Sequence, residues 1–242
     1  MLDQMGYNRL GKMAKSVGGR SQAVYRTLKR AILDQALAPG TKLPEDSIGE
    51  RLGVSRTLVR EAVVRLSDEG LVELRPNKGA SVARPSLDEG HDLFVTRVAL
   101  ERLVVEIVAG KLSDAEHEEL AKHTAAEEEA NGLDGGASIR LAGEFHSMLA
   151  AMTGNAILSR YVNELVSRSS LILALYGRPH SSECAVSEHR ELLAMLKLGD
   201  TKRAADLMTE HLDAITTRAL LPREKVADIR DVLASYARAE GL

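Results

Sequence analysis

The sequence predicts a mostly α-helical protein, with an N-terminal winged helix-turn-helix and a C-terminal antiparallel bundle in which every element is a helix. Residues 21–85 show three helical patterns followed by a hairpin pattern, which is the order of elements in a winged helix-turn-helix. From residue 86 to 220 the apolar residues recur with a helical period. The charge changes at the same boundary: residues 1–85 hold 15 Lys and Arg against 9 Asp and Glu, and residues 86–242 hold 17 against 26.

The first helix is expected to begin at Ser21, because apolar residues then recur on one helical face as far as Ile32. It is expected to stop before the turn at Pro39-Gly40. Residues 1–20 show no sustained period and are therefore expected to form a flexible tail.

Two more helices and a hairpin complete the first module. A short second helix should end at Gly53, which suits a C-terminal stop. Ser55 is a suitable N-cap for a third helix, which carries an apolar stripe and ends at Gly70. Residues 71–74 and 80–83 are expected to form two short strands joined by a hairpin loop.

The second module, residues 86–220, is expected to hold about six antiparallel helices and no strand. Turn signals that contain glycine separate its helical segments, at Gly110, 132–136, Gly154, 177–179 and Gly199. A last amphipathic stretch, residues 221–242, is expected to form a C-terminal helical extension that packs on the bundle or on a partner.

The composition excludes several classes of protein. With 44% hydrophobic and 28% charged residues, the chain is expected to be soluble and globular, and no apolar run approaches the ~20 residues of a membrane helix. The single cysteine, Cys184, cannot form an internal disulfide, so the cytoplasm is the expected compartment. Trp is absent and Phe occurs twice, which argues against a reader of single strands that stacks bases on aromatic rings.

The third helix has the features of a DNA-recognition helix. Arg56 and Arg60 are one turn apart, so they share the face opposite the apolar stripe, and the hydroxyls of Ser55 and Thr57 lie at the same end. The first turns of such a helix enter the major groove, where an arginine binds O6 and N7 of guanine together. A solvated helix face is the alternative for an arginine pair alone.

The hairpin loop favours the DNA-binding interpretation. Lys78-Gly79 at its tip suits a wing that lies along the phosphate backbone or in the minor groove. The excess of positive charge in this module would attract a polyanion over a longer range.

The segment LGVSRTLVREAVVRLSDEGLVEL, residues 52–74, resembles the signature of the GntR superfamily of bacterial winged-helix regulators. The resemblance implies base or phosphate contacts for the two arginines and phosphate contacts for the two hydroxyl residues. Relatives often have Arg-Gly in the wing, where this chain has Lys78-Gly79, so its wing contacts are expected to be electrostatic more than base-specific.

Three of the seven histidines lie inside strongly periodic helical segments of the bundle: His146, His189 and His211. A histidine in such a place is often a core residue satisfied by one hydrogen bond. Three histidines on separate helices can instead converge on a metal, because imidazole binds Zn, Ni or Fe and bundles build metal sites from facing helices. The residues alone leave both interpretations open.

Segments around these histidines resemble the effector-binding FCD domain of the FadR-type branch of the superfamily, over about residues 91–218. The segments are GEFHSMLAAMTGN (143–155), SEHRELLAML (187–196) and GDTKRAADLMTEHL (199–212), with a looser match at Arg97, Leu100 and Glu101. The resemblance implies that the three histidines bind a divalent metal, with zinc expected first and nickel or iron as alternatives, beside an effector cavity.

The resemblance also implies a fourth metal ligand and an effector-binding arginine. Relatives usually have Asp four residues before the first histidine, where this chain has Ala142, so water or an effector carboxylate is expected to complete the metal shell. Arg97 resembles the arginine that meets effector carboxylates, and Arg168 is a looser candidate. For both arginines a surface salt bridge is the alternative role.

These observations predict a transcription regulator. The family resemblance implies that it is a repressor, because repression is the usual action of such regulators. Its homodimer is expected to bind near-palindromic double-stranded DNA, with an operator affinity that a small organic acid controls. A metal-dependent enzyme of the three-histidine type is a second interpretation, but the sequence lacks the H-E-x-x-H pattern of such enzymes. An architectural DNA binder without a ligand is the third, and it would have a solid bundle.

Overall fold

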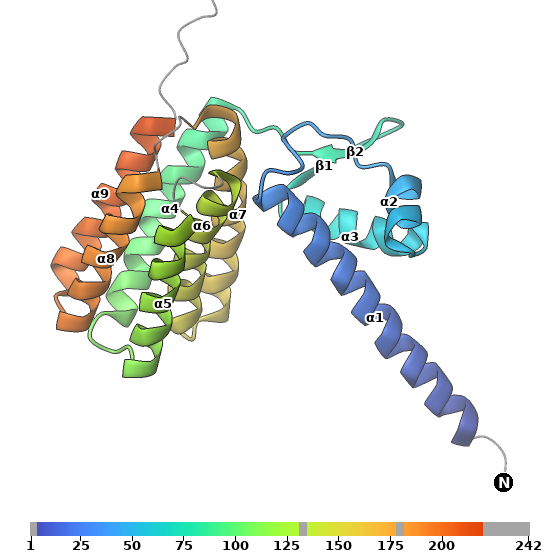
Figure 1. The fold of residues 1–242 in the computed structure, drawn as a ribbon, viewed down its shortest axis with the longest axis horizontal. Helices are drawn as coiled ribbons and strands as arrows, with labels where there is room; N and C mark the ends of the chain where they lie inside the picture. The colour runs from blue at the N-terminus through green and yellow to red at the C-terminus, as the bar shows by residue number, and fades with distance from the viewer. Residues whose placement is uncertain (1–3, 131–134, 178–181, 220–242) are drawn as a thin grey trace, which may run out of the picture.

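The computed structural model describes residues 4–130, 135–177 and 182–219, and these form two modules (Figure 1). The N-terminal module consists of α1 (Gln4–Leu33), α2 (Glu45–Leu52), α3 (Arg56–Asp68), β1 (Val72–Arg75) and β2 (Gly79–Val82). The described part of the C-terminal module consists of α4 (Leu87–Val108), α5 (Asp114–Ala130), α6 (Gly135–Met152), α7 (Ala156–Tyr176), α8 (Ser182–Leu198) and α9 (Thr201–Ala219). The mostly helical fold, a winged helix-turn-helix followed by a helical bundle, is therefore confirmed.

Helix α1 is longer than the sequence predicts. It begins at Gln4 rather than Ser21, so residues 4–20 continue the helix where a flexible tail was expected, and Figure 1 shows this part projecting away from the bundle. Residues 4–20 contain no proline. Packing of the later turns already supplies a helical nucleus, so each added residue needs only the cheaper propagation step. The extension expected at residues 221–242 lies outside the described residues.

The turn between α2 and α3 is as tight as a helix-turn-helix requires. Gly53 ends α2 with φ of 64°, and the Oγ atom of Ser55 caps α3 by accepting a hydrogen bond from the amide of Leu58. A Cβ on Gly49 would lie 2.9 Å from the carbonyl oxygen of Val54. The missing side chain at Gly49 therefore lets the turn fold back against α2.

The core of the N-terminal module holds α3 by its apolar face. The apolar stripe of α3 is buried against α1 and the hairpin, through Val59, Ala62, Val63 and Leu66. The antiparallel pair β1–β2 runs from Val72 opposite Val82 to Arg75 opposite Gly79, so residues 76–78 form its tip. The apolar face of α3 is thereby buried, and the opposite face is exposed.

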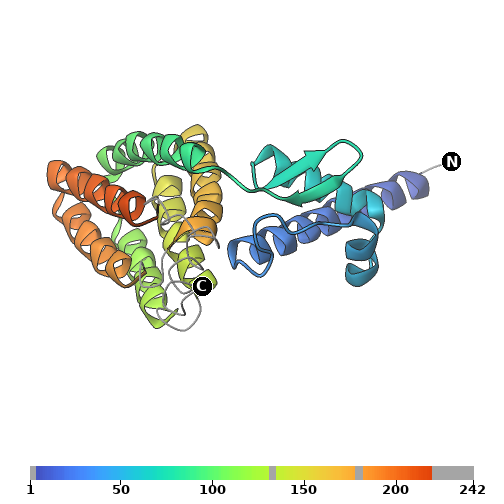
Figure 2. The same cartoon turned by 90° about the horizontal axis from the view of Figure 1, so that it is seen from above.

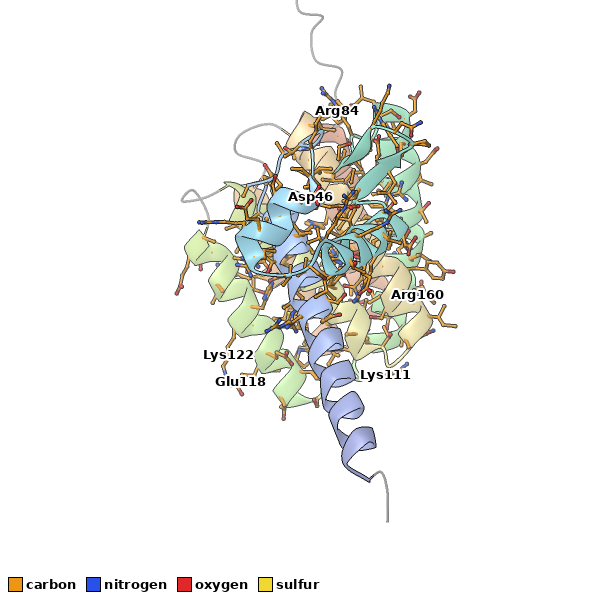
Figure 3. All side chains as sticks on the ribbon, turned by 90° about the vertical axis from the view of Figure 1, so that its right-hand side faces the viewer. Asp46, Arg84, Lys111, Glu118, Lys122 and Arg160 are labelled. Atoms are coloured by element: carbon orange, nitrogen blue, oxygen red, sulfur yellow. The ribbon has the colours of Figure 1, made fainter. Side chains whose placement is uncertain are left out.

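The helices of the C-terminal module surround a common apolar core (Figure 2). Helix α4 packs on α7 and α9, α5 packs on α6 and α8, and α6 packs on α7. Charged side chains cover the outer surface, as Glu118 and Lys122 of α5 illustrate in Figure 3 with exposed fractions of 67% and 74%. Charged or polar groups found inside this bundle therefore require an explanation.

The two modules meet at α6 and α7. The Nε atom of Arg140 on α6 donates to Oδ1 of Asp34, just beyond α1, at 2.5 Å. Leu171 of α7 is buried in the apolar core of the N-terminal module. These two helices therefore contact the N-terminal module at the same time as they form the wall of the bundle interior.

Candidate nucleic-acid interface and metal centre

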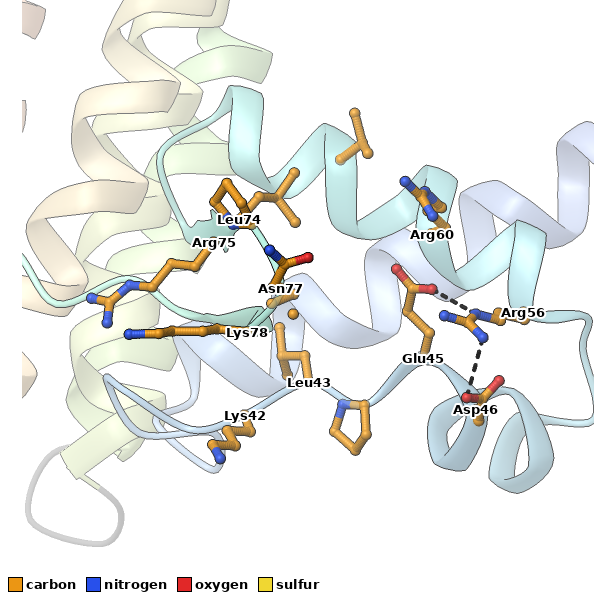
Figure 4. Close-up of a pocket in the computed structure, with 15 residues that line it drawn as sticks. Lys42, Leu43, Glu45, Asp46, Arg56, Arg60, Leu74, Arg75, Asn77 and Lys78 are labelled. Carbon is orange, nitrogen blue, oxygen red and sulfur yellow. Dashed lines mark hydrogen bonds and ion pairs between the residues drawn. The ribbon is translucent and has the colours of Figure 1, made fainter.

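A groove of about 810 Å³ lies between α2, α3 and the hairpin (Figure 4). Arg56 and Arg60 line it from α3, and Lys78 and Gly79 line it from the hairpin tip. Both arginines are exposed, as the position opposite the apolar stripe requires. The fold thus places four of the residues singled out in the sequence on one surface.

Two further cations, Lys42 and Arg75, line the same groove, and sequence reasoning missed both. Lys42 precedes α2 and forms an isolated β-bridge with Ser81, which brings it beside the hairpin. Arg75 is the last residue of β1. Neither residue belongs to a helical pattern, so only the pairing of the strands reveals that they add positive charge to this surface.

Ser55 and Thr57 are both exposed at the start of α3. The Oγ atom of Ser55 accepts the amide hydrogen of Leu58 at 3.4 Å, which uses the oxygen as a helix cap and leaves the hydroxyl hydrogen to donate elsewhere. Such a hydrogen suits a phosphate oxygen, and the N-terminus of α3 carries the positive end of the helix dipole.

Arg56 is paired with two acidic residues at the start of α2. Its Nε donates to Oε2 of Glu45 at 2.9 Å, and its Nη1 lies 3.5 Å from Oδ2 of Asp46. The hydrogen bond to Glu45 raises the pKa of Arg56, so this guanidinium keeps its charge. The groove is basic along the hairpin but carries negative charge where α2 begins.

The three candidate metal ligands meet inside the bundle. His146 on α6, His189 on α8 and His211 on α9 are all buried, and one ligand atom from each lies within 4.8 Å of the others. The Nε2 atom of His211 is 3.3 Å from Nε2 of His189 and 3.2 Å from Nε2 of His146. The fold therefore joins residues that lie up to 65 positions apart in the sequence.

Each imidazole has a carboxylate on its other nitrogen, Nδ1. The pairs are His189 with Glu127 of α5 at 2.8 Å, His211 with Glu188 of α8 at 2.6 Å, and His146 with Glu101 of α4. An ionised carboxylate only accepts hydrogen bonds, so a neutral imidazole in such a pair carries its hydrogen on Nδ1. The Nε2 lone pairs are then directed at the shared centre, which is the arrangement found around metal-bound histidines.

Sequence reasoning found the histidines but missed two of these carboxylates. It assigned no role to Glu127 or to Glu188. Glu188 precedes His189 in the chain, but its carboxylate contacts His211 on the next helix. A single helical period does not show such a contact, because the partner comes from another element.

The charge state of the centre suits a cation. Burial raises the pKa of Glu101, but the charge of Arg97 and the hydrogen bonds from Arg97 and His146 outweigh burial and bring this pKa down to about 2. Burial lowers the pKa of His146 below its ordinary value. At neutral pH Glu101 is therefore ionised and His146 is neutral, which is the form that binds a metal.

The donor set fits a zinc ion. Tetrahedral zinc with Zn–N bonds of 2.0–2.1 Å separates two nitrogen ligands by roughly 3.3–3.4 Å, and the two measured Nε2 separations are 3.3 and 3.2 Å. If no cation were bound, neutral imidazoles would direct lone pairs at one another with no hydrogen between them. Ala142, one turn before His146, offers no donor, so the described side chains of this centre supply three ligands.

Arg97 is buried beside this centre. Its Nε donates to Oε1 of Glu101 at 2.7 Å, and its Nη1 donates to Oγ of Ser169 at 3.0 Å. Its Nη2 has no hydrogen-bond partner among the residues that the structure describes. An unpaired buried N–H group costs free energy, and a bound anion would satisfy it. The ion pair of Arg97 is therefore buried, in contrast to the surface salt bridge considered as its alternative.

Arg168 lies at the junction of the two modules. Its Nη2 pairs with Glu89 of α4, and its Cδ would be 2.8 Å from a Cβ on Gly70, at the end of α3. The side chain is 28% exposed. The structure thus shows a partly exposed salt bridge for Arg168, and an effector contact by this residue stays a prediction.

Comparison with known proteins identifies a family domain over each module. Residues 20–82 match the bacterial regulatory proteins of the gntR family, and residues 92–214 match the FCD domain. The chain is 27% identical to YdhC, an HTH-type transcriptional regulator of Bacillus subtilis (strain 168), over 78% of this chain and 86% of YdhC. It is 25% identical to the HTH-type transcriptional repressor RspR of Escherichia coli (strain K12), over 86% of this chain and 92% of RspR.

A solved chain from Rhodococcus sp. RHA1 has the same fold, with a TM-score of 0.76 and 24% identity, over 85% of this chain and 100% of that one. Within the described ranges, no helix has the length and apolar character needed to cross a bilayer. The family to which both matched regions point consists of transcription regulators rather than enzymes. The chain belongs to the GntR family of bacterial regulatory proteins, and it joins the DNA-binding domain of that family to a C-terminal FCD domain, as FadR-type regulators do.

Proposed function

We propose that this regulator is a cytoplasmic repressor that binds a near-palindromic operator as a homodimer and responds to a small organic acid in its FCD domain. In this proposal Arg56 and Arg60 contact bases, while Ser55, Thr57 and Lys78-Gly79 contact phosphates. The observation that carries the effector is the buried Arg97 with its unpaired Nη2 beside the histidine centre. The name of RspR, a repressor, supports the sign of the regulation.

The chemistry of the bundle interior favours a carboxylate as effector. The Nη2 atom of Arg97 needs an acceptor, and Glu101 joins Arg97 to His146 by contacting both. A divalent metal held by the three histidines would supply an open coordination position, because Ala142 replaces the usual Asp ligand. A carboxylate would satisfy the arginine and that position together, which a neutral molecule does less well.

A route from this site to the DNA-binding module runs along α7. Arg97 donates to Ser169 on α7, and the neighbouring Arg168 and Leu171 contact the N-terminal module. An anion that draws Arg97 away from Ser169 would therefore act on the helix against which the winged helix packs. The expected result is a change in how the two recognition helices of a dimer match their half-sites.

Arg97→Lys tests the effector proposal. Lysine keeps a positive charge near Glu101 but loses the planar fork, so the response of the operator complex to carboxylates should weaken by about 10- to 100-fold in effector concentration. Operator affinity without effector and metal content should stay at wild-type values. The measurement is operator binding titrated with a panel of small mono-, di- and tricarboxylates.

Ser169→Ala serves as the second variant, because it removes the contact of Arg97 with α7 and leaves the ion pair with Glu101 intact. This variant should still bind the carboxylate, but the bound carboxylate should no longer change its operator affinity. If no carboxylate changes operator affinity of the wild-type protein, the effector proposal fails and the architectural interpretation gains support.

The dimer is proposed to form through adjacent faces of α4 and α7. Val95 and Leu103 of α4 lie two helical turns apart and are 72% and 43% exposed, and Ile157 and Tyr161 of α7 are 65% and 47% exposed. Exposed apolar side chains on two helices that pack on each other favour a contact with another chain.

Leu103→Glu and Val95→Glu should therefore convert a dimer to a monomer in sedimentation velocity experiments, because each change places a charge in the proposed interface. Leu198→Glu, at a residue that is 75% exposed at the end of α8, is the matched control and should remain dimeric. A wild-type monomer at micromolar concentration would contradict the proposal.

A further inference from the structure

The first turn of α2 places two carboxylates beside the main candidate for base reading. Oε2 of Glu45 accepts a hydrogen bond from Nε of Arg56 at 2.9 Å, whereas Oδ2 of Asp46 lies 3.5 Å from Nη1. Figure 4 shows both contacts at one end of the groove, beneath α3. Neither carboxylate has a role in the proposed function so far.

The two carboxylates differ in how firmly the fold holds them. The side chain of Glu45 is 18% exposed, against 76% for Asp46 and 63% for Arg56. Figure 3 shows Asp46 on the N-terminal module. Glu45 alone combines a short hydrogen bond to Arg56 with a largely buried position, so it is the residue able to restrict the arginine.

The hydrogen bond to Glu45 determines which N–H groups of Arg56 remain available to DNA. A guanidinium has five N–H groups in a fixed planar fork, and guanine accepts two of them at O6 and N7. Because Glu45 takes the Nε–H, the N–H groups on Nη1 and Nη2 remain for a base. A long side chain that is already held in this way loses less rotamer freedom when it binds.

We infer that Glu45 is a positioning residue for base reading, which holds Arg56 with its terminal nitrogens presented to guanine. This inference rests on the proposed role of α3 as the DNA reader. Asp46 carries the same charge at the next position but is exposed and farther from the guanidinium. Its negative charge repels phosphates without orienting the arginine, so it weakens binding to any sequence.

A purely structural role for Glu45, in which its charge stabilises α2, makes the opposite predictions for Glu45→Asp and Glu45→Gln. An acidic residue in the first turn stabilises a helix through the helix dipole, and any residue with a negative charge there does the same. Under that role Glu45→Asp preserves function and Glu45→Gln loses it. Under the positioning role Glu45→Gln keeps an oxygen that reaches Nε, whereas the side chain of Glu45→Asp is one methylene too short.

The experiment uses the full chain and an operator selected by it from a pool of random duplexes. Dissociation constants are measured for this operator, for versions with each G·C pair replaced, and for a scrambled duplex. We expect Glu45→Asp and Glu45→Ala to lower the ratio of operator affinity to scrambled-duplex affinity about tenfold. Glu45→Gln should keep this ratio close to wild type, and Asp46→Asn should bind both duplexes more tightly with an unchanged ratio.

The lost discrimination should fall on the same G·C pair that Arg56→Ala no longer distinguishes, and Glu45→Ala in the Arg56→Ala background should cost nothing more. Discrimination that is lost in Glu45→Gln and kept in Glu45→Asp overturns the inference, as does equal weakening on operator and scrambled duplex. If Arg56→Ala itself leaves discrimination unchanged, the proposed role of α3 fails instead. The Arg56 variant thus separates the two failures.

Discussion

Arg56→Ala is expected to remove a large part of the preference for the operator over unrelated DNA. A good pair of hydrogen bonds from arginine to guanine is worth about 1–3 kcal/mol against the wrong base. A dimer on a near-palindromic operator makes this contact twice, so the loss should be about 30-fold or more. The side chain is exposed and its ion pairs are with acidic side chains of α2, so the change should not unfold the module.

Electrophoretic or fluorescence titration with the selected operator measures this effect. Arg203→Ala, which removes a partly exposed arginine of α9 that pairs with Glu191 and Glu210, is the matched control and should bind like wild type. Lys78→Ala should behave differently from Arg56→Ala, with weaker binding to all sequences and a salt slope that falls by about one. Unchanged operator affinity in Arg56→Ala would disprove the assignment of α3 as the recognition helix.

Purified wild-type protein is expected to contain one zinc or similar divalent ion per chain, and His189→Ala is expected to contain none. The Nε2 atom of His211 already lies 3.3 and 3.2 Å from those of His189 and His146, as two ligands of a tetrahedral ion would, and each Nδ1 is paired with a carboxylate. Removing the metal by chelation should also lower Tm. A ligand present at 100 times its Kd stabilises a folded protein by about 2.7 kcal/mol, which is roughly 5–10 °C for a chain of this size.

Elemental analysis of untagged protein and differential scanning calorimetry measure these effects. His91→Ala, an exposed histidine on α4, is the matched control and should keep the metal. His189→Gln guards against misfolding, because it fills most of the space beside Glu127. Wild-type protein without metal after reconstitution with zinc, nickel or iron salts would refute the metal centre and leave effector sensing to Arg97.

The metal should also be retained to a lower pH than exposed histidines would allow. Imidazole must be neutral to bind a metal, so affinity falls as the pH drops through the pKa of the ligands. Burial lowers the pKa of His146, so this ligand stays neutral below the ordinary range of histidine. Metal content followed from neutral to acidic pH checks this direction.

Many features of the fold can be predicted from the local pattern of apolar and turn residues in the sequence. The apolar stripe of α3 and the position of Arg56 and Arg60 opposite to it follow from one helical period, and the structure confirms the buried face. The turn residues between the helices follow in the same way. The start of α1 at Gln4 could not be predicted. Residues 4–20 extend a helix whose later turns are packed, so they need no periodic apolar pattern to be helical.

The sequence by itself determined the order of the elements, the exposed face of α3 that carries Arg56 and Arg60, and the three histidines of the bundle. Only the tertiary structure decided which side chains meet them: the carboxylates behind the imidazoles, the unpaired nitrogen of Arg97, the position of Arg168 at the module junction and the contact of Glu45 with Arg56. The physical reason is that periodicity reports which face of an element is buried. The partner on that face comes from a distant part of the chain and is set by packing.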